Sequence, residues 1–293
     1  MSKLLCPVGC KYCMASRITI RSKHWVDNSK KIGMNKSCVF FNRLPSDPPL
    51  KDMNLPFNLL HGEYLGFQGI TDCMWDVYYE DLKWLVNHLE DFGVRKLVLT
   101  TKMPISNKHL ELFSHNPRIL VVYSLTGLDT LENTTTEERL HSINLLRENG
   151  VDVLPIIHPY IHGYSNLSFL EDLKRMGIKH ISWKGFRYNP TTMAELEKYI
   201  PSRILDKYAG HDENEVLQGA AYLTELTKSF DLEYIDLKDY IQTHKAGVGS
   251  PVAYTIAQQE VNDLAEQVVF SSSEQDKQKI IDYCIKRRTI IKY

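Results

Sequence analysis

The feature that most constrains the fold is an alternation between short β-rich runs and helical patterns along the middle of the chain. After a first run at 3–5, β-rich runs occur at 64–68, 96–100, 118–124, 152–157 and 180–183. Helical patterns lie at about 77–92, 106–114, 136–149, 167–176 and 191–208. This order is typical of parallel strands joined by helical crossovers. Six strands are too few for a closed eightfold barrel. The sequence therefore predicts an α/β fold, a partial, open (β/α)6-type parallel barrel with functional groups at the carboxyl ends of its strands.

Two segments depart from the alternation. Residues 14–60 contain four prolines and no regular pattern, which in a compact domain indicates a long loop over a functional site. Beyond residue 208 the pattern is mostly helical. We expect a core at 1–208, which includes the long basic loop at 14–60. A C-terminal helical region at 209–293 would then serve as a lid or a substrate-binding extension.

Charge is unevenly distributed. The chain has a net charge of -1, yet its first 51 residues contain ten Lys or Arg against two Asp. This segment predicts an anionic partner, such as a nucleic acid, although a solvated basic face remains the alternative. No apolar run approaches the roughly 18 residues needed to cross a bilayer. The sequence thus predicts a cytoplasmic protein that does not associate with a membrane.

Three of the six cysteines lie within eight residues, in the run Cys6-Pro-Val-Gly-Cys10-Lys-Tyr-Cys13. This clustering favours metal ligation over disulfides. Three thiolates on one loop can hold three corners of a 4Fe-4S cluster and leave the fourth iron without a protein ligand. A zinc site is the alternative, but zinc normally takes four protein ligands, and no second paired motif completes such a set. We expect Cys38, Cys73 and Cys284 to be small buried hydrophobes.

The cysteine spacing, with Tyr12 before the last cysteine, resembles the signature of the radical S-adenosylmethionine (SAM) superfamily. Four later segments resemble the branch that contains spore photoproduct lyase, and each follows an expected strand. These segments are Gly69-Ile-Thr-Asp72, Leu99-Thr-Thr-Lys102, Val122-Tyr-Ser-Leu-Thr126 and Pro155-Ile-Ile-His-Pro159. The resemblance covers roughly residues 1–190.

The resemblance implies two cofactors, a 4Fe-4S cluster and SAM. It assigns the cluster to Cys6, Cys10 and Cys13, and it places Tyr12 close to the adenine of SAM. The residues that it places around the rest of SAM are Thr71, Lys102 and Ser124. Arg139 matches an arginine of the branch and could hold Glu132 or a carboxylate. Lys102 also points to function by its position, since a lysine at the end of a buried strand is rarely without a partner.

The implied reaction is the reductive cleavage of SAM to methionine and a 5′-deoxyadenosyl radical, which abstracts hydrogen from a substrate. It needs an electron donor such as flavodoxin or ferredoxin. One departure concerns the substrate, because Gly69 occupies the position of the hydrogen-donating cysteine of the branch, and Cys73 lies two positions after Thr71 instead. The resemblance therefore supports the SAM-binding core more than DNA repair.

The substrate stays open in the sequence. The basic segment favours a nucleic acid or a phosphorylated molecule, and a peptide or small metabolite is the alternative. From another class, the chain could be a non-enzymatic zinc or iron-sulfur module that binds nucleic acid. Residues near expected strand ends are candidates for substrate contact, namely Tyr123, His158, Tyr160, His162, Tyr164, Trp183, Arg187 and Tyr188.

Overall fold

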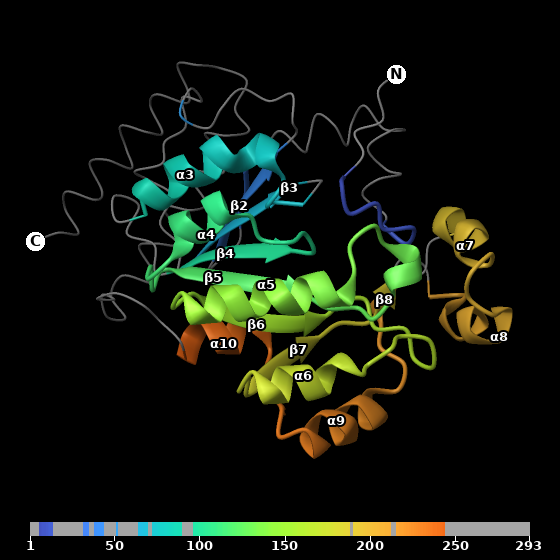
Figure 1. The fold of residues 1–293 in the computed structure, drawn as a ribbon. Coiled ribbons are helices and arrows are strands. Elements are labelled where there is room, and N and C mark those ends of the chain that lie inside the picture. Colours follow the sequence, from blue (N-terminus) through green and yellow to red (C-terminus); the bar gives the residue numbers. More distant parts are fainter. Residues whose placement is uncertain are drawn as a thin grey trace, which may run out of the picture.

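The computed structural model describes residues 6–13, 32–34, 38–43, 51, 64–69, 72–89, 96–187, 190–211 and 215–243. Within these ranges, one open sheet has the order β1-β2-β3-β4-β5-β6-β7-β10 (Figure 1). Its strands are β1 (Ile32–Met34), β2 (Cys38–Arg43), β3 (Tyr64–Gly69), β4 (Lys96–Thr101), β5 (Ile119–Ser124), β6 (Asp152–Ile157), β7 (His180–Trp183) and β10 (Glu233–Tyr234). All neighbours pair in parallel except β1 and β2, which are antiparallel. The predicted partial, open parallel barrel is confirmed.

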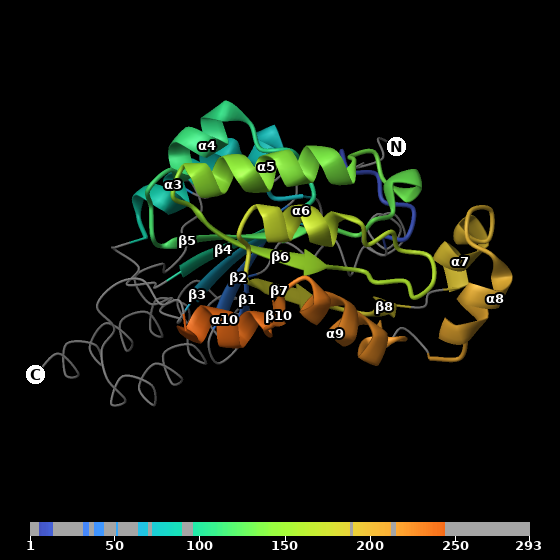
Figure 2. The same cartoon turned by 60° about the horizontal axis from the view of Figure 1, so that its bottom comes forward.

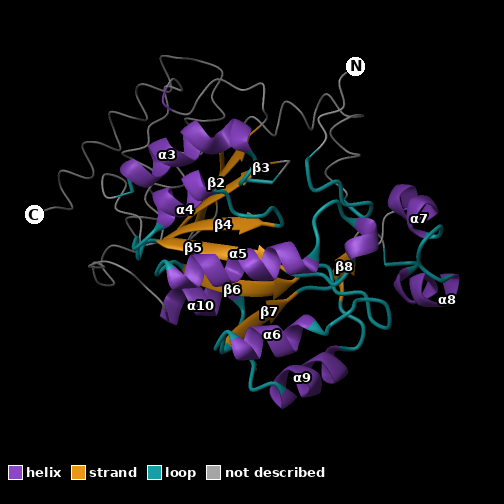
Figure 3. Ribbon diagram, in the orientation of Figure 1, coloured by secondary structure: helices purple, strands orange, loops and turns teal. Residues whose placement is uncertain are grey.

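Helices connect the strands, as Figure 3 shows in purple. They are α3 (Tyr79–Asn87), α4 (Asn107–Phe113), α5 (Thr136–Glu148), α6 (Phe169–Arg175), α7 (Pro190–Leu196), α8 (Ser202–Leu205), α9 (Ala220–Ser229) and α10 (Leu237–Thr243). Single 3-10 turns are η3 (Asp76–Tyr78), η4 (Asp129–Leu131) and η5 (Asp206–Tyr208), and a small antiparallel pair joins β8 (Phe186–Arg187) to β9 (Glu215–Val216). Among the described residues, no helix is both long and apolar enough to cross a membrane.

Helix α5 has the clearest start signal in the sequence, and it begins where that signal indicates. Thr135 accepts a hydrogen bond from the backbone of Glu138, and the Glu138 side chain bonds back to the Thr135 backbone. This capping box satisfies two of the backbone N–H groups that a helix start leaves free. It defines the start of α5 directly after the loop that carries Glu132 and Asn133.

Two sequence expectations need correction. The helix expected over 191–208 is instead α7, α8 and η5, because Pro201 has no N–H to continue a helix and lies at the N-cap of α8. The expected irregular connection at 14–60 contains β1 and β2, and the run Cys38-Val-Phe-Phe supplies residues that favour strands. The expected strand at 3–5 lies outside the described residues. The division at residue 208 stays a prediction, and β10 pairs with β7 across it.

Strand alternation gives the sheet two faces, each with its own core. On one face, Leu99, Val121 and Tyr123 pack among buried residues of α3–α6. The opposite face, here called the inner face, carries Val98, Leu120, Val122, Leu154 and Ile156, which pack against Tyr240 and Ile241 of α10. Figure 2 shows α3–α6 above the sheet and α10 below it.

Helix α10 is anchored to the amino ends of the strands. Tyr240 donates a hydrogen bond of 2.6 Å to Asp152, and Lys96 forms an ion pair of 2.7 Å with the same carboxylate. The carboxyl ends of the strands, where parallel sheets place their functional groups, therefore lie at the other edge.

Candidate active site

The three clustered cysteines lie on a tightly turned loop, residues 6–13. The backbone N–H of Gly9 donates to the carbonyl of Cys6 at 3.0 Å, and Cys13 donates to Cys10 at 3.1 Å. Gly9 has φ +59°, which side chains rarely adopt, and a Cβ there would lie 2.3 Å from the side-chain nitrogen of Asn133. A glycine is thus required both by the turn and by the close approach of Asn133.

This loop is fastened to the connection between β5 and α5. Lys11 N–H donates to the carbonyl of Leu131 at 2.9 Å, and Asn133 N–H donates to the carbonyl of Val8 at 2.8 Å. The Asn133 amide also donates to the carbonyl of Pro7 at 3.1 Å. Because this connection follows the carboxyl end of β5, the cysteines lie at the functional edge of the sheet, as Figure 1 shows for the dark-blue loop.

A buried carboxylate ties the loop to α5. One oxygen of Glu132 accepts hydrogen bonds from the Tyr12 hydroxyl and, at 3.7 Å, from the Cys10 thiol. The other oxygen accepts from Thr126 at 2.8 Å and from the guanidinium of Arg139 at 2.5 Å. Burial raises the pKa of Glu132 to about 7, and Arg139 opposes that rise. The predicted pairing of Arg139 with Glu132 is present.

Arg139 also links the ends of two strands. It donates to the carbonyl of Lys102 at 3.1 Å, to the carbonyl of Ser124 at 3.3 Å and to the Thr134 hydroxyl at 2.7 Å. Its side chain is fully buried, so in the structure it acts on the site through these groups. The cofactor contact that the resemblance implies for Arg139 stays a prediction.

A second buried carboxylate, Asp72, connects the ends of β3 and β4. It accepts hydrogen bonds from Thr101 at 2.6 Å, from Lys102 N–H at 2.7 Å and from Met74 N–H at 3.0 Å. Burial raises the pKa of Asp72, which these hydrogen bonds counteract. Burial also raises the pKa of the Cys6 thiol, and the charge of Asp72 adds to that rise. Asp72 therefore contacts the backbone of Lys102 and also acts on the first cysteine.

Lys102 is half-buried and turns toward the cysteine loop, where its ammonium lies 5.8 Å from the centre of the Tyr12 ring. Burial raises the pKa of the Cys10 thiol well above its usual value, and the Lys102 charge lowers it. A thiol with a raised pKa becomes a ligand only when metal binding displaces its proton. The tertiary structure thus joins Cys6, Cys10, Tyr12 and Lys102 into one site.

The donor set of this loop suits an iron-sulfur cluster. Cys6, Cys10 and Cys13 are all free of disulfides and partly exposed, on a loop held rigidly by backbone bonds. Thiolates are the ligands that such clusters use. Among the described residues, no group of three or more His, Cys, Asp or Glu side chains is arranged around a single metal ion.

Three other residues singled out in the sequence have different outcomes. Ser124 is buried at the end of β5, and its hydroxyl donates to the carbonyl of His158 at 2.8 Å. Thr71 lies outside the described residues. Cys73 is buried as expected, and its thiol donates to the carbonyl of Thr100 at 3.2 Å. The cofactor contacts of Ser124 and Thr71 stay predictions.

Several of the residues expected to contact the substrate have packing roles. Tyr123, Tyr160 and Trp183 are buried in the core under the helices. The Tyr160 hydroxyl bonds to His162 at 2.9 Å, and Tyr164 donates to the carbonyl of Tyr199 at 3.1 Å. His158 and Arg187 remain near the carboxyl ends of the strands, and Tyr188 lies outside the described residues.

Sequence reasoning missed three residues of this region. The sequence motifs indicate neither Asn133 nor Lys184, and they indicate Glu132 only as a partner of Arg139. A signal existed for Lys184, since it follows β7 as Lys102 follows β4. None existed for Asn133, because only the folded chain brings it against Gly9.

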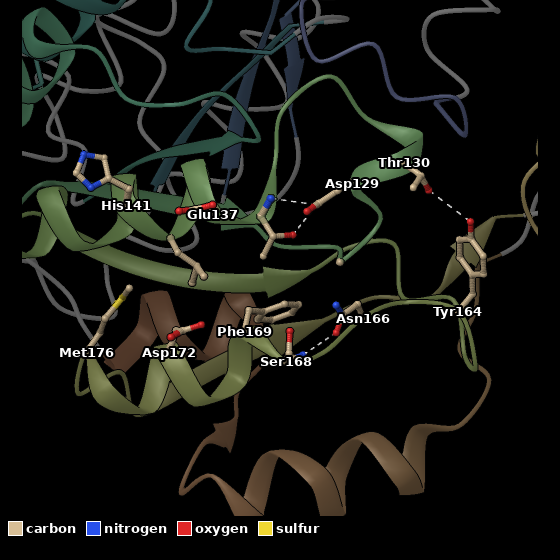
Figure 4. Close-up of a pocket in the computed structure, with 13 residues that line it drawn as sticks. Asp129, Thr130, Glu137, His141, Tyr164, Asn166, Ser168, Phe169, Asp172 and Met176 are labelled. Atoms are coloured by element: carbon tan, nitrogen blue, oxygen red, sulfur yellow. Dashed lines mark hydrogen bonds between the residues drawn. The ribbon is translucent and has the colours of Figure 1, made fainter.

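A cavity of about 780 Å³ opens elsewhere, on the helical side of the sheet (Figure 4). Its lining comes from η4, α5 and α6 and from the loop before α6, and it includes Leu140, Phe169 and Met176 among polar residues. Asp129 on its rim already accepts hydrogen bonds of 3.0 and 2.6 Å from the backbone and hydroxyl of Thr136. Tyr164, a candidate for substrate contact, lines this cavity, whereas none of the described residues predicted to bind the cluster or SAM does.

No protein-family model and no curated protein matches the chain. Similar solved structures exist. SuiB of Streptococcus suis bound to S-adenosylmethionine has a TM-score of 0.46 at 12% identity, over 87% of this chain and 50% of SuiB. SuiB bound to precursor peptide SuiA has a TM-score of 0.38 at 13% identity, over 66% of this chain and 50% of SuiB.

Spore photoproduct lyase complexed with dinucleoside spore photoproduct has a TM-score of 0.49 at 12% identity, over 82% of this chain and 71% of that enzyme. It gives its name to the branch that the sequence motifs resemble. The chain spans only half the length of these SuiB chains. At such low identity the likeness concerns the course of the chain, and the activity and ligands of this protein are matters for proposal.

Proposed function

We propose that this protein is a radical SAM enzyme in which Cys6, Cys10 and Cys13 hold a 4Fe-4S cluster. One observation carries the proposal: the three-cysteine loop is fastened to the carboxyl edge of a parallel sheet directly beside the ammonium of Lys102. The cysteine loop would hold the cluster, and the nearby cation would pair with the carboxylate of SAM. When bound, the cluster would supply the electron that cleaves the sulfonium of SAM and so starts radical chemistry.

The residues around the loop would bind and orient SAM. Lys102 would pair with the carboxylate, because an ammonium forms strong charge-assisted hydrogen bonds. Tyr12 would pack near the adenine. Ser124 keeps acceptor lone pairs after its bond to His158, and these suit an amino or ribose hydroxyl group. Thr71 would add a hydroxyl, as the resemblance implies.

The buried carboxylates would keep this arrangement rigid. Glu132 holds the Tyr12 hydroxyl and the Cys10 thiol on one side, and Asp72 holds the backbone of Lys102 on the other. Such support limits the motion of reacting groups. A reducing protein such as flavodoxin or ferredoxin would deliver the electron, and the basic first segment supports an anionic substrate.

Anaerobic purification tests the proposal. We expect a brown protein with about four irons per chain, which cleaves SAM to methionine and 5′-deoxyadenosine when reduced with dithionite. Replacing Cys6, Cys10 and Cys13 together by Ala should remove the colour and the cleavage. Cys73→Ala is the matched control and should keep both, because its thiol bonds to Thr100 in the core.

Two results would overturn the proposal. A colourless protein with one zinc would favour a non-enzymatic metal-binding module. Reductive cleavage that persists in the triple variant would show that these cysteines are not the ligands.

A further inference from the structure

The strand register brings His158 and Lys184 next to each other on the sheet. Ile157 of β6 pairs with Trp183 of β7, and the residue after each is His158 or Lys184. The ladder continues beyond the strands, because Lys184 N–H donates to the carbonyl of Ile157 at 2.9 Å. Trp183 belongs to the core under the helices, so alternation directs Lys184 toward the inner face.

Lys102 and Ser124 lie on the same face of the sheet, at the ends of the neighbouring strands β4 and β5. Thr101 pairs with Tyr123, so Lys102 and Ser124 follow as neighbours, and Ser124 pairs with Ile156. The Ser124 hydroxyl reaches the carbonyl of His158. The polar groups of four neighbouring strand ends therefore form one continuous site.

Three positive charges act on the His158 ring. Burial and then the charges of Lys102, Lys184 and Arg187 lower the pKa of His158 to about 3. The imidazole is therefore neutral near pH 7 and offers one N–H donor. Lys102 is the cation that also acts on Cys10, so its charge influences both the cysteine loop and His158.

Lys184 has no acidic partner of its own in the described part of the chain. It is exposed, and no described carboxylate forms an ion pair with it. Arg187 is also exposed and lies 3.9 Å from Glu215, whose other oxygen accepts from Gly185 N–H at 3.0 Å. Two cations thus lie near enough to act on a neutral donor, and among the described residues they have only a single loose acidic contact.

We propose that His158, Lys184 and Arg187 form a second anion site, which binds a phosphate group of the substrate. This inference rests on the proposed function, since it takes Lys102 to be occupied by the carboxylate of SAM. A guanidinium and an ammonium are the side chains that bind phosphate best, and a neutral imidazole can donate to a third oxygen. The substrate class is a phosphate ester, either a free nucleotide or a nucleotide within a nucleic acid.

Binding of phosphate-bearing probes to the full-length protein tests this site. Calorimetric titration would use a 2′-deoxymononucleotide and a short single-stranded oligodeoxynucleotide, with and without a reconstituted cluster. Lys184→Met should weaken binding by about tenfold or more for whichever probe occupies the site, because the variant loses a charged hydrogen bond. Lys184→Arg should restore most of the affinity.

Lys179→Met is the matched control, because Lys179 is exposed just before the amino end of the same strand. It should bind the probe as the unchanged protein does. Lys184→Met should keep its affinity for SAM, whereas Lys102→Met should bind SAM more weakly. Binding of the mononucleotide identifies a free nucleotide as the phosphate source, and binding of the oligonucleotide alone identifies a nucleic acid.

Failure of the second anion site can be distinguished from failure of the proposed function. If SAM is cleaved but Lys184→Met and Lys179→Met bind both probes equally, the second anion site is wrong and the proposed function stands. If no cluster forms and SAM is not cleaved, yet Lys184→Met alone loses the probe, the anion site stands and the proposed function falls. Circular dichroism of each variant excludes unfolding as the cause.

Discussion

The carboxylate of Glu132 lies 2.5 Å from the guanidinium of Arg139, and neither side chain is exposed to solvent. The pair joins the cysteine loop to α5, because Glu132 also accepts from Tyr12 and Cys10. Removing one member of a buried ion pair leaves the other charge without compensation, which typically costs about 3–5 kcal/mol. The stability of the cysteine loop is therefore linked to a helix more than a hundred residues away in the sequence.

Glu132→Gln should lower the free energy of unfolding of the metal-free protein by about 3–5 kcal/mol and reduce the iron bound per chain. Denaturant unfolding and iron analysis measure the two effects. Glu171→Gln is the control, because its ion pair with Arg175 has the same length of 2.5 Å but is exposed. It should cost less than about 1 kcal/mol. Equal losses in both variants would contradict the buried role of Glu132.

Gly9→Ala should impair cluster binding beyond the cost of backbone strain. Any side chain at a positive φ costs about 1–2 kcal/mol, and here the added Cβ would also meet the Asn133 amide. Gly163→Ala is the matched control, since Gly163 has φ +79° with nothing within 4 Å. We expect iron content to fall in Gly9→Ala and to stay normal in Gly163→Ala. Normal iron content in both would show that the close approach of Asn133 is unimportant.

Lys102→Met should weaken SAM binding by roughly 10- to 100-fold, the effect of losing one charged hydrogen bond. Iron content should not change, because the Lys102 backbone still bonds to Asp72. Lys108→Met serves as control, since Lys108 pairs with Asp76 at 3.0 Å away from the cysteines. Equilibrium dialysis with SAM measures both variants. A loss of SAM affinity that is as large in Lys108→Met would argue against a specific role for Lys102.

His109 should make the fold less stable in mild acid. Its ring is buried between Tyr79 and Phe113, and burial lowers its pKa to about 4. The unfolded chain binds this proton near pH 6.5, so stability is complete above that pH and falls as the pH drops toward 4. We expect a loss of roughly 1–3 kcal/mol across this window. Denaturant unfolding at pH 7 and pH 4.5 measures it.

His109→Phe should show a smaller loss between these two pH values than the unchanged protein. His141→Gln, which removes an exposed histidine, should lose as much as the unchanged protein does. If the loss is identical in all three proteins, His109 does not cause it.

The sequence alone determined the elements whose signals are local. The central strands and α3–α6 lie where their runs and patterns predict, because strand alternation and helix capping depend on neighbours in the chain. The cysteine loop is equally local, since its spacing and Gly9 specify a turn that presents three thiols. The lysine after β4 was also visible, as a charge in an otherwise apolar context.

Only the tertiary structure decided which distant groups share the site. The contact of Glu132 with Tyr12 and Cys10, the fit of Asn133 against Gly9, and the approach of Lys184 to His158 depend on how strands and loops pack. The two-residue strand β10 was likewise invisible, because pairing with β7 creates it. Such contacts join residues far apart in the chain, and their energy comes from burial and charge in the folded state.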